Sequence, residues 1–169
     1  MSAHDIAEPS AWILRWAPLI TRGTVLDVAC GSGRHAKFFL GKGLKAVAVD
    51  RDAQAIPGAR FVRADLENGN PWPLPGEQFE GIVVTNYLHR PLFPRLIEAL
   101  APGGVLLYET FMLGNERFGK PSNPEFLLRP GELREAFAGL SEKGFEEGPV
   151  TLPKPAMIQR LCAMQARKG

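Results

Sequence analysis

Three aspartates stand at or near the ends of apolar, strand-like runs, and their type and spacing suit them best for chemistry. Asp27 lies four positions before Gly31 in the stretch VLDVACGSGRHA, while Asp50 and Asp65 follow near the ends of the next two runs. A buried carboxylate is unfavourable unless a partner or hydrogen bonds compensate for its lost hydration. Each aspartate is therefore either satisfied by its own turn or positioned to hold a ligand.

The glycine turn after Asp27 narrows the choice of ligand. Residues 31–36 match the G-x-G-x-x-A fingerprint of dinucleotide-binding turns, and the helix that follows points its positive end at the turn. Nicotinamide-binding domains keep the strand position of Asp27 apolar, and a carboxylate there repels a pyrophosphate. The cationic amino-acid end of S-adenosylmethionine (SAM) suits this acid. Asp27 is therefore predicted to anchor SAM, with a purely structural acid that rigidifies the turn as the alternative.

The elements that must position these residues alternate between strand-like and helical patterns. This β-α-β-α rhythm predicts an α/β protein with a doubly wound, mostly parallel sheet and helices on both faces. The expected parallel strands are 24–30, 45–50, 59–66, 79–88 and 104–111. The expected helices are 10–20 with Ser10 as N-cap, 34–42, a short one near 52–56, 92–100 and 130–139.

The end of the chain departs from this rhythm. Two extended stretches, 144–152 and 157–166, are separated by only the four residues PKPA. A parallel crossover needs a dozen or more residues, so this connection allows only an antiparallel hairpin. The prediction is one domain, 1–169, with a seven-stranded sheet, an N-terminal helical segment at 1–22 and a substrate lid at 112–130.

The motifs LDVACGSG, VAVDRD and ADLEN, in that order, give the chain a resemblance to a known family. Over residues 10–112 it resembles the seven-stranded class I SAM-dependent methyltransferases. The resemblance implies that Asp50 binds the ribose hydroxyls and that Asp65, with the Leu66 backbone beside it, holds the adenine amine. The stretches CGSGRHAKFFLGKGLKAVAVD and FLLRPGELREAF also resemble the tellurite-resistance type of small-molecule methyltransferase.

This resemblance implies a cofactor, a product and a set of cofactor contacts. The cofactor is SAM, which leaves as S-adenosylhomocysteine (SAH). The residues expected to bind it are Asp27, Ala29, Gly31, Gly33, Asp50, Arg51, Asp65, Leu66 and Asn86. No metal site is predicted.

The catalytic candidates follow the fourth and fifth strands, where this fold presents the methyl group. They are His89 as a general base or a loop histidine, Tyr87 as a pocket wall or packing residue, and Glu109 as a pocket-facing or ion-paired acid. The stretch VVTNYLHRP lacks the prolines of the Asn/Asp-Pro-Pro-aromatic motif found in many amino-group methyltransferases. Base amines and protein amides are therefore less favoured acceptors.

Aromatic and basic side chains at the 112–130 segment suggest what a lid there would do. Phe111, Phe118 and Phe126 are expected to shield the methyl group, and Arg117 and Arg129 to receive an anionic acceptor. Lys120 is expected to be solvated.

Composition limits the partners. The net charge is +2, and the 20 basic residues are scattered, so nucleic acid is an unlikely partner. No apolar run approaches a membrane span, and two cysteines, Cys30 and Cys162, fit a reducing, cytoplasmic setting without a disulfide bond. His4 and His35 are expected at the surface, and the oligomeric state is left open.

The function predicted from these residues is methyl transfer from SAM to a small-molecule acceptor, with a soft sulfur, selenium or tellurium nucleophile as one candidate. Three alternatives stay open: a SAM-binding regulatory module, an RNA or protein methyltransferase and, less favoured, a nucleotide-cofactor oxidoreductase.

Overall fold

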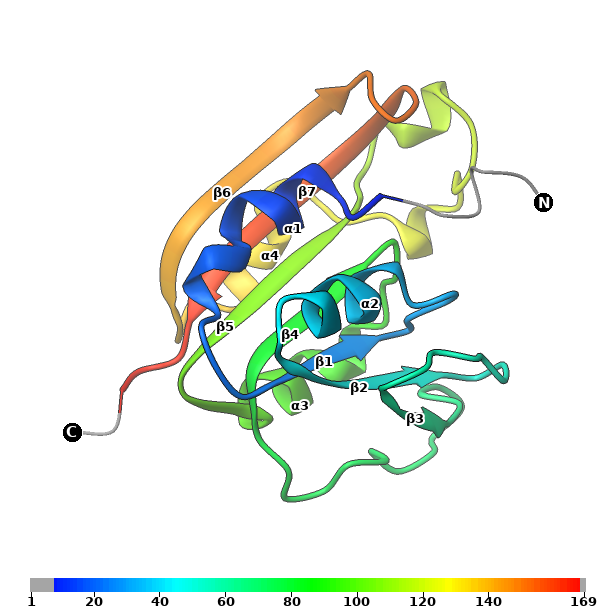
Figure 1. Cartoon of the computed structure of the whole chain (residues 1–169). Coiled ribbons are helices and arrows are strands. Elements are labelled where there is room, and N and C mark those ends of the chain that lie inside the picture. The colour runs from blue at the N-terminus through cyan, green and yellow to red at the C-terminus, as the bar shows by residue number, and fades with distance from the viewer. Residues whose placement is uncertain (1–7, 168–169) are drawn as a thin grey trace.

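The computed structural model describes residues 8–167, and its strands form one seven-stranded sheet in the order β3-β2-β1-β4-β5-β7-β6 (Figure 1). The strands are β1 (Thr24–Val28), β2 (Lys45–Asp50), β3 (Arg60–Arg63), β4 (Phe79–Thr85), β5 (Leu100–Phe111), β6 (Ser141–Val150) and β7 (Ala156–Met164). The α-helices are α1 (Ala11–Trp16), α2 (Arg34–Gly41), α3 (Phe93–Glu98) and α4 (Glu132–Ala136).

The strand directions confirm the predicted mixed sheet. Strands β1 to β5 pair in parallel, whereas β7 runs antiparallel to both β5 and β6. The short connection between β6 and β7 thus forms the expected hairpin at one side of the sheet. Strands β4 and β5 separate β1 from β7, and Cys30 and Cys162 are both free and buried, as predicted.

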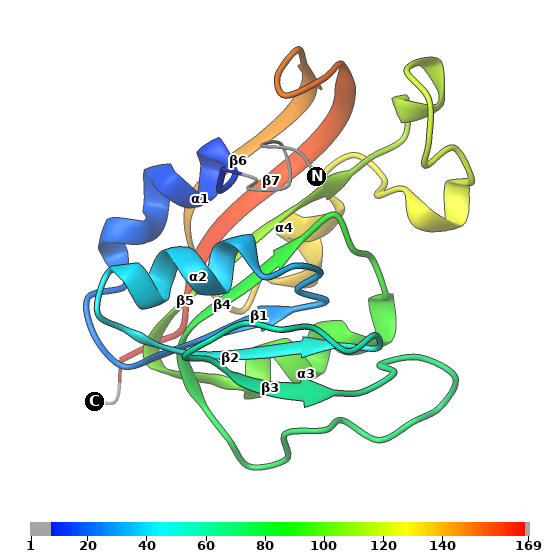
Figure 2. The ribbon, with the colours of Figure 1, turned by 45° about the vertical axis from the view of Figure 1, so that its right-hand side comes forward.

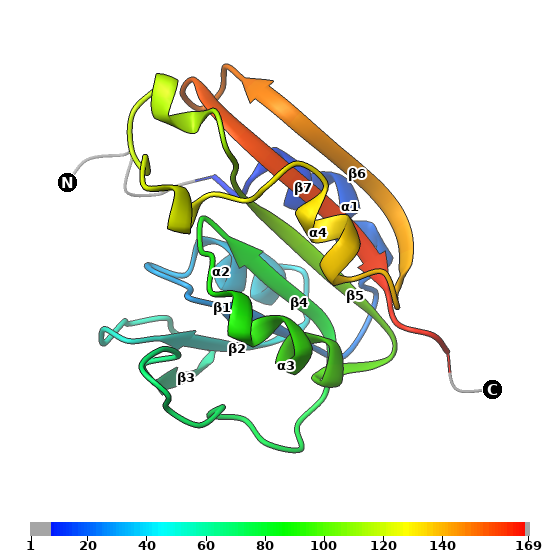
Figure 3. The same ribbon diagram turned by 180° about the vertical axis from the view of Figure 1, so that it is seen from behind.

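Helices cover both faces of the sheet. In Figure 1 α1 and α2 lie in front of it, and Figure 3 shows α3 and α4 on the opposite face. Because side chains alternate along a strand, Val25 of β1 packs in the core beneath α1 and α2, whereas Leu26 and Val28 pack on the α3 side. Asp27 has the same parity as Val25, so its carboxylate points toward α2.

Three local predictions were wrong. The helix near 52–56 is absent, and Ile56 is instead buried against α2 and the alanines of β2. His35 is buried rather than at the surface. Strand β5 already begins at Leu100 and so includes the residues that were expected to form a loop. Its pairing with β4 shifts register between Phe79 and Gly81. Only glycine fits at position 104, where a Cβ would lie 2.8 Å from a carbonyl oxygen of Phe79.

The N-terminal helix agrees with its predicted start. Ser10 caps α1, because its hydroxyl oxygen accepts the N–H of Trp12. The described part of the segment 1–22 contains α1 and the 3-10 turn η2 (Ala17–Leu19). The prediction for His4 lies outside the described residues. Among residues 8–167, no helix is both long enough and apolar enough to cross a bilayer.

The segment 112–130 is fastened at its base. Met112 pairs with Leu128 in a bridge, and the buried Asn115 side chain bonds both the Pro121 carbonyl and the Met157 N–H. Between these anchors it forms two short turns, η4 (Asn115–Arg117) and η5 (Pro124–Phe126). Figure 2 shows this yellow-green segment rising beside the tip of the β6–β7 hairpin.

Candidate functional site

The three predicted acids lie on neighbouring strands. Strands β3, β2 and β1 are adjacent and parallel, so their carboxyl ends meet at one edge of the sheet. Asp50 ends β2, Asp65 follows β3 by two residues, and Asp27 is the penultimate residue of β1. This edge is where open α/β sheets bind their ligands.

Asp27 is the most deeply buried of the three acids, with 2% of its surface exposed. Its Oδ2 accepts the N–H of Ala36 in the first turn of α2 at 3.0 Å. Burial is the main cause that raises the pKa of this carboxyl to about 7. Asp27 therefore caps the helix after the glycine turn, and its contact with a ligand stays a prediction.

The two glycines of the turn serve different purposes. Gly31 has φ +54°, and a Cβ added to it would meet open space. Gly33 has φ +85°, and its Cβ would lie 2.5 Å from the Ile56 side chain. Gly31 thus leaves room for a ligand, whereas Gly33 is required for packing beneath the turn.

Asp50 and Asp65 are held by backbone N–H groups. Oδ1 of Asp50 accepts the Gly31 N–H at 3.2 Å, and its Oδ2 accepts the Asp52 N–H at 3.0 Å. Asp65 accepts the Glu67 N–H and the Asn68 side-chain amide. These hydrogen bonds, with smaller contributions from Arg51 and His89, hold the pKa of the Asp65 carboxyl below its usual range.

A cavity of about 550 Å³, here called the acidic cavity, opens at this edge. It is lined by Ala29, Gly31, Asp50, Arg51, Asp52, Gln54, Ala64, Asp65, Leu66, Glu67, Asn86, Tyr87 and Phe126. Four carboxylates therefore face one guanidinium, an arrangement that favours a cationic ligand and disfavours a phosphate. The lining includes seven of the nine predicted cofactor residues but neither Asp27 nor Gly33.

A second cavity of about 310 Å³, the lid cavity, adjoins the base of the 112–130 segment. Its walls are Glu67, Asn86, Tyr87, Leu88, Thr110, Phe111, Pro121 and Phe126. The Tyr87 hydroxyl donates to Glu67 at 2.9 Å. Burial and this carboxylate raise the pKa of Tyr87 well above its usual range, so its hydroxyl stays protonated.

A third and larger cavity, about 760 Å³, lies between the N-terminal segment and the β6–β7 hairpin. This N-terminal cavity is lined by Glu8, Pro9, Ser10, Ala11, Arg34, Asn86, Glu109, Phe111, Val150, Leu152, Pro153, Lys154, Ala156, Ile158 and Arg160. Asn86 lines all three cavities. It follows β4 with φ +55°, and its N–H donates to the Glu109 carbonyl.

Glu109 both faces this cavity and is ion-paired, so the two interpretations of this acid hold together. It is 8% exposed, pairs with Arg160 of β7 and accepts the Ser10 hydroxyl at 2.6 Å. Ser10 also donates its N–H to Nε2 of His35, which explains why His35 is buried. Burial, with a smaller effect of Arg34, lowers the pKa of His35 to about 3, so the imidazole is neutral.

His89 is close enough to Asp65 to lower the pKa of that carboxyl, but it does not itself line any of the three cavities. It is half-buried at the N-cap of the turn η3 (Arg90–Leu92). Arg117 and Arg129 are also outside these linings, whereas Phe111 and Phe126 are within them. The structure thus brings Tyr87, Glu109 and Asn86 to the cavities but not His89.

Several lining residues are absent from the predicted site. Glu67 belongs to the ADLEN motif quoted above, so its place beside Asp65 could have been inferred. Arg34, Lys154 and Arg160 come from α2, a turn and β7, and only the folded chain brings them together.

Comparison with known proteins identifies the fold and the family. A family model described as a methyltransferase domain matches residues 1–138. The chain belongs to this family. The predicted class I fold and SAM as the cofactor of the domain are thereby confirmed. The acidic cavity fits that cofactor, since its carboxylates can accept hydrogen bonds from hydroxyl and amine groups, its net negative charge suits a cation, and Gly31 leaves space beside them.

Curated relatives of this methyltransferase domain include two trans-aconitate 2-methyltransferases. The protein of Methylobacterium nodulans is 31% identical over 115 residues, which are 62% of this chain and 44% of that protein. The protein of Rhizobium etli is 29% identical over 172 residues, which are 94% of this chain and 64% of that protein. The chain thus spans about half the length of the curated relatives that it matches.

Solved structures with the same fold include other methyltransferases. TehB from Haemophilus influenzae superposes with a TM-score of 0.73 at 17% identity, over 90% of this chain and 61% of that one. A Burkholderia thailandensis 1,6-didemethyltoxoflavin-N1-methyltransferase with bound SAH superposes with a TM-score of 0.64 at 20% identity, over 92% of this chain and 76% of that one. At these identities the likeness concerns the fold.

Proposed function

We propose that this chain transfers the methyl group of SAM to a small organic acid and forms a methyl ester. The observation that carries the proposal is that three cavities share Asn86 in their linings. One is acidic and suits a cationic donor, and the other two leave room for an acceptor of modest size. In this arrangement the chain chiefly aligns donor and acceptor and excludes water.

The cofactor side of the proposal assigns roles to the predicted residues. Asp50 accepts the ribose hydroxyls, and Asp65 with the Leu66 backbone holds the adenine. Gly31, Ala29, Arg51 and Asn86 form walls of the same site. Asp27 and Gly33 act from behind it, because they fix the start of α2 and the packing of the turn.

The position of His89 bears on the acceptor. Bound SAM supplies an electrophilic methyl carbon, which forms a bond to the acceptor while its bond to sulfur breaks and leaves the neutral thioether SAH. A hydroxyl or amine acceptor would need a base to take its proton, and His89 lies outside the cavity linings. A carboxylate is already deprotonated at neutral pH and needs no base.

The names of the curated relatives support a carboxylate acceptor. They are trans-aconitate 2-methyltransferases, and trans-aconitate is a small polycarboxylic acid. A soft sulfur, selenium or tellurium anion shares the property of needing no base, and it is the competing candidate.

The test supplies SAM with an isotopically labelled methyl group together with trans-aconitate, a thiol or tellurite. The expected result is micromolar SAM binding and label in a product that releases methanol on mild alkaline treatment, as esters do and thioethers do not. Asp50→Ala is expected to weaken SAM binding by roughly tenfold or more, because charge-assisted hydrogen bonds are lost. Glu77→Gln, a change outside the cavity linings, is the control.

Three outcomes would contradict parts of this proposal. Alkali-stable label on the thiol or on tellurium would replace the carboxylate by a soft acceptor. SAM binding without turnover on any acceptor would favour a regulatory module. Absence of SAM binding in the folded protein would overturn the proposed function altogether.

A further inference from the structure

We infer that the N-terminal cavity is the acceptor site and that Arg34 and Lys154 select an acid with at least two carboxylates. This inference rests on the proposed function and adds the place and the recognition chemistry of the acceptor. Arg34 lies on the helix that follows the glycine turn and Lys154 on the β6–β7 turn, so the two cations reach this cavity from different elements.

The position of the cavity suits an acceptor. It shares Asn86 with the acidic cavity, so the two cavities are separated by as little as one residue. Its volume of about 760 Å³ lies within the range of roughly 300–1,000 Å³ for small-molecule sites. The lid cavity is less than half as large.

The charges of the three cavities differ in sign. The N-terminal cavity has three cations, Arg34, Lys154 and Arg160, against two carboxylates, Glu8 and Glu109. The charge of Glu109 is balanced by its ion pair with Arg160, and the Ser10 hydroxyl donates to it, so Arg34 and Lys154 remain against Glu8 alone. Glu67 is the one carboxylate in the lid-cavity lining, and no lysine or arginine accompanies it there. Among these cavities, only the N-terminal one favours an anion.

The walls between the cations are apolar. Phe111 and Ile158 line the interior with Val150 and Ala156, and Leu152 stands beside Lys154 on the turn. A short hydrocarbon chain therefore fits between a carboxylate at the cations and a second carboxylate that reaches toward Asn86. The second carboxylate is the nucleophile, and the first one is the recognition group.

The experiment measures two binding events separately on the full chain. Calorimetric titration with SAH reports the donor site, and titration of the SAH-loaded protein with trans-aconitate reports the acceptor site. Arg34→Gln and Lys154→Gln are each expected to weaken the binding of trans-aconitate by roughly tenfold, because a charge-assisted contact is lost. Both variants are expected to keep the wild-type affinity for SAH within about twofold, which also shows that they are folded.

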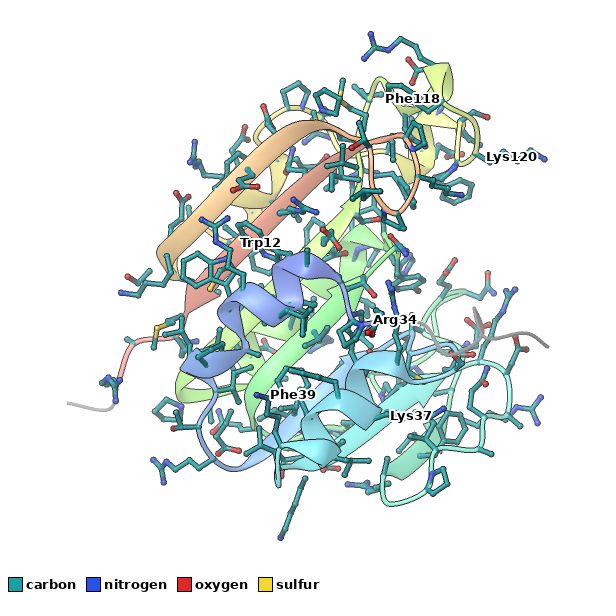
Figure 4. All side chains as sticks on the ribbon, turned by 45° about the horizontal axis from the view of Figure 1, so that its top comes forward. Trp12, Arg34, Lys37, Phe39, Phe118 and Lys120 are labelled. Carbon is teal, nitrogen blue, oxygen red and sulfur yellow. The ribbon has the colours of Figure 1, made fainter. Side chains whose placement is uncertain are left out.

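Matched controls remove a lysine without touching the cavity. Lys37 is on α2, one turn after Arg34, and Lys120 is on the 112–130 segment; both are exposed. Figure 4 shows Arg34 close to the start of α1, whereas Lys37 lies farther along α2 and Lys120 lies at the outer end of the lid. Lys37→Gln and Lys120→Gln are expected to leave both affinities unchanged.

The outcomes separate the inference from the function on which it rests. Loss of acid binding in the Arg34 and Lys154 variants alone supports the inference. Equal losses in the two controls, or no acid binding by SAH-loaded wild type, overturn it while the SAM-dependent function stands. If SAH itself does not bind, the proposed function fails first.

Discussion

At the scale of the residue, Asp27 has a structural role at the start of α2 and a predicted role in binding the methyl donor. Its carboxylate lies between the sheet and α2 and accepts an N–H from the first turn of α2. The sequence indicated that the acid needs a partner, and the structure identifies Ala36 as that partner. The second possibility, a contact with the ammonium group of the donor, requires the ionised carboxylate, and burial works against ionisation.

The raised pKa of Asp27 predicts a pH effect on stability. The folded state holds this proton up to about pH 7, whereas the unfolded chain releases it near pH 4. The contribution of Asp27 to the free energy of unfolding is therefore fully present below pH 4 and is lost as the pH rises through 7. The loss is at most about 4 kcal/mol. Asp27→Asn does not titrate, so the difference in free energy of unfolding between wild type and variant should fall across this window.

Urea unfolding of both proteins at pH 5 and pH 7.5 measures this difference. His35 has the opposite effect. Its pKa is lowered in the folded state, so the contribution of neutral His35 to the free energy of unfolding is lost as the pH falls from about 6.5 toward 3. Both proteins contain His35, so its contribution cancels. Parallel pH profiles for the two proteins would show that Asp27 does not titrate in this range.

A second prediction at this scale concerns His89. Since it is not in the cavity linings, His89→Ala should change kcat on the true acceptor by less than about threefold, whereas loss of a general base costs about 100-fold or more. Steady-state kinetics measure this directly. A drop of that larger size with SAM affinity intact would restore His89 as the base.

At the scale of the element, Arg90 joins three segments at the end of the 112–130 stretch. Its guanidinium forms two hydrogen bonds to Glu132 of α4 and one each to the carbonyls of Glu125 and Leu127. Burial would raise the pKa of Glu132, but the hydrogen bonds from Arg90 and from the Arg129 N–H hold it below its usual range. The loop after β4, the end of the 112–130 segment and the start of α4 are therefore fixed to one another.

Arg90→Ala should lower the free energy of unfolding by about 2–3 kcal/mol, because it removes both side-chain hydrogen bonds to the buried Glu132 carboxylate and leaves it only the longer pair with Arg129 at 3.6 Å. Arg60→Ala is the matched control. Arg60 forms a similar two-bond pair with Glu77, but that pair is largely exposed and screened by water, so its loss should lower the free energy of unfolding by much less than the loss of Arg90 does. Equal losses in chemical denaturation would mean that burial of Glu132 has no effect on the strength of the pair.

At the scale of the whole molecule, the general architecture could be predicted because it depends on local rules. Alternating apolar runs predicted the parallel strands, and the four-residue connection PKPA predicted the hairpin. The prediction of a helix near 52–56 was wrong, because Ile56 packs beside Gly33, and this contact joins residues that are distant in the sequence. The prediction that His35 lies at the surface was wrong for the same kind of reason, since its hydrogen-bond partner Ser10 is 25 positions away.

The site was predictable to the extent that its residues follow strand ends. Asp50, Asp65, Leu66 and Asn86 occupy such positions, and all four line the acidic cavity. The N-terminal cavity could not be predicted from the sequence, because its walls come from five separated stretches that no local pattern connects.

The left-handed backbone of Asn86 also matters for anyone who wishes to redesign this protein. One residue forms part of three compartments, so a substitution at position 86 would disturb donor and acceptor together and make its effect hard to interpret. Leu152 and Ala156 border a single compartment among these three. A library built on these two positions would change the size and shape of the incoming molecule while leaving the donor's surroundings untouched.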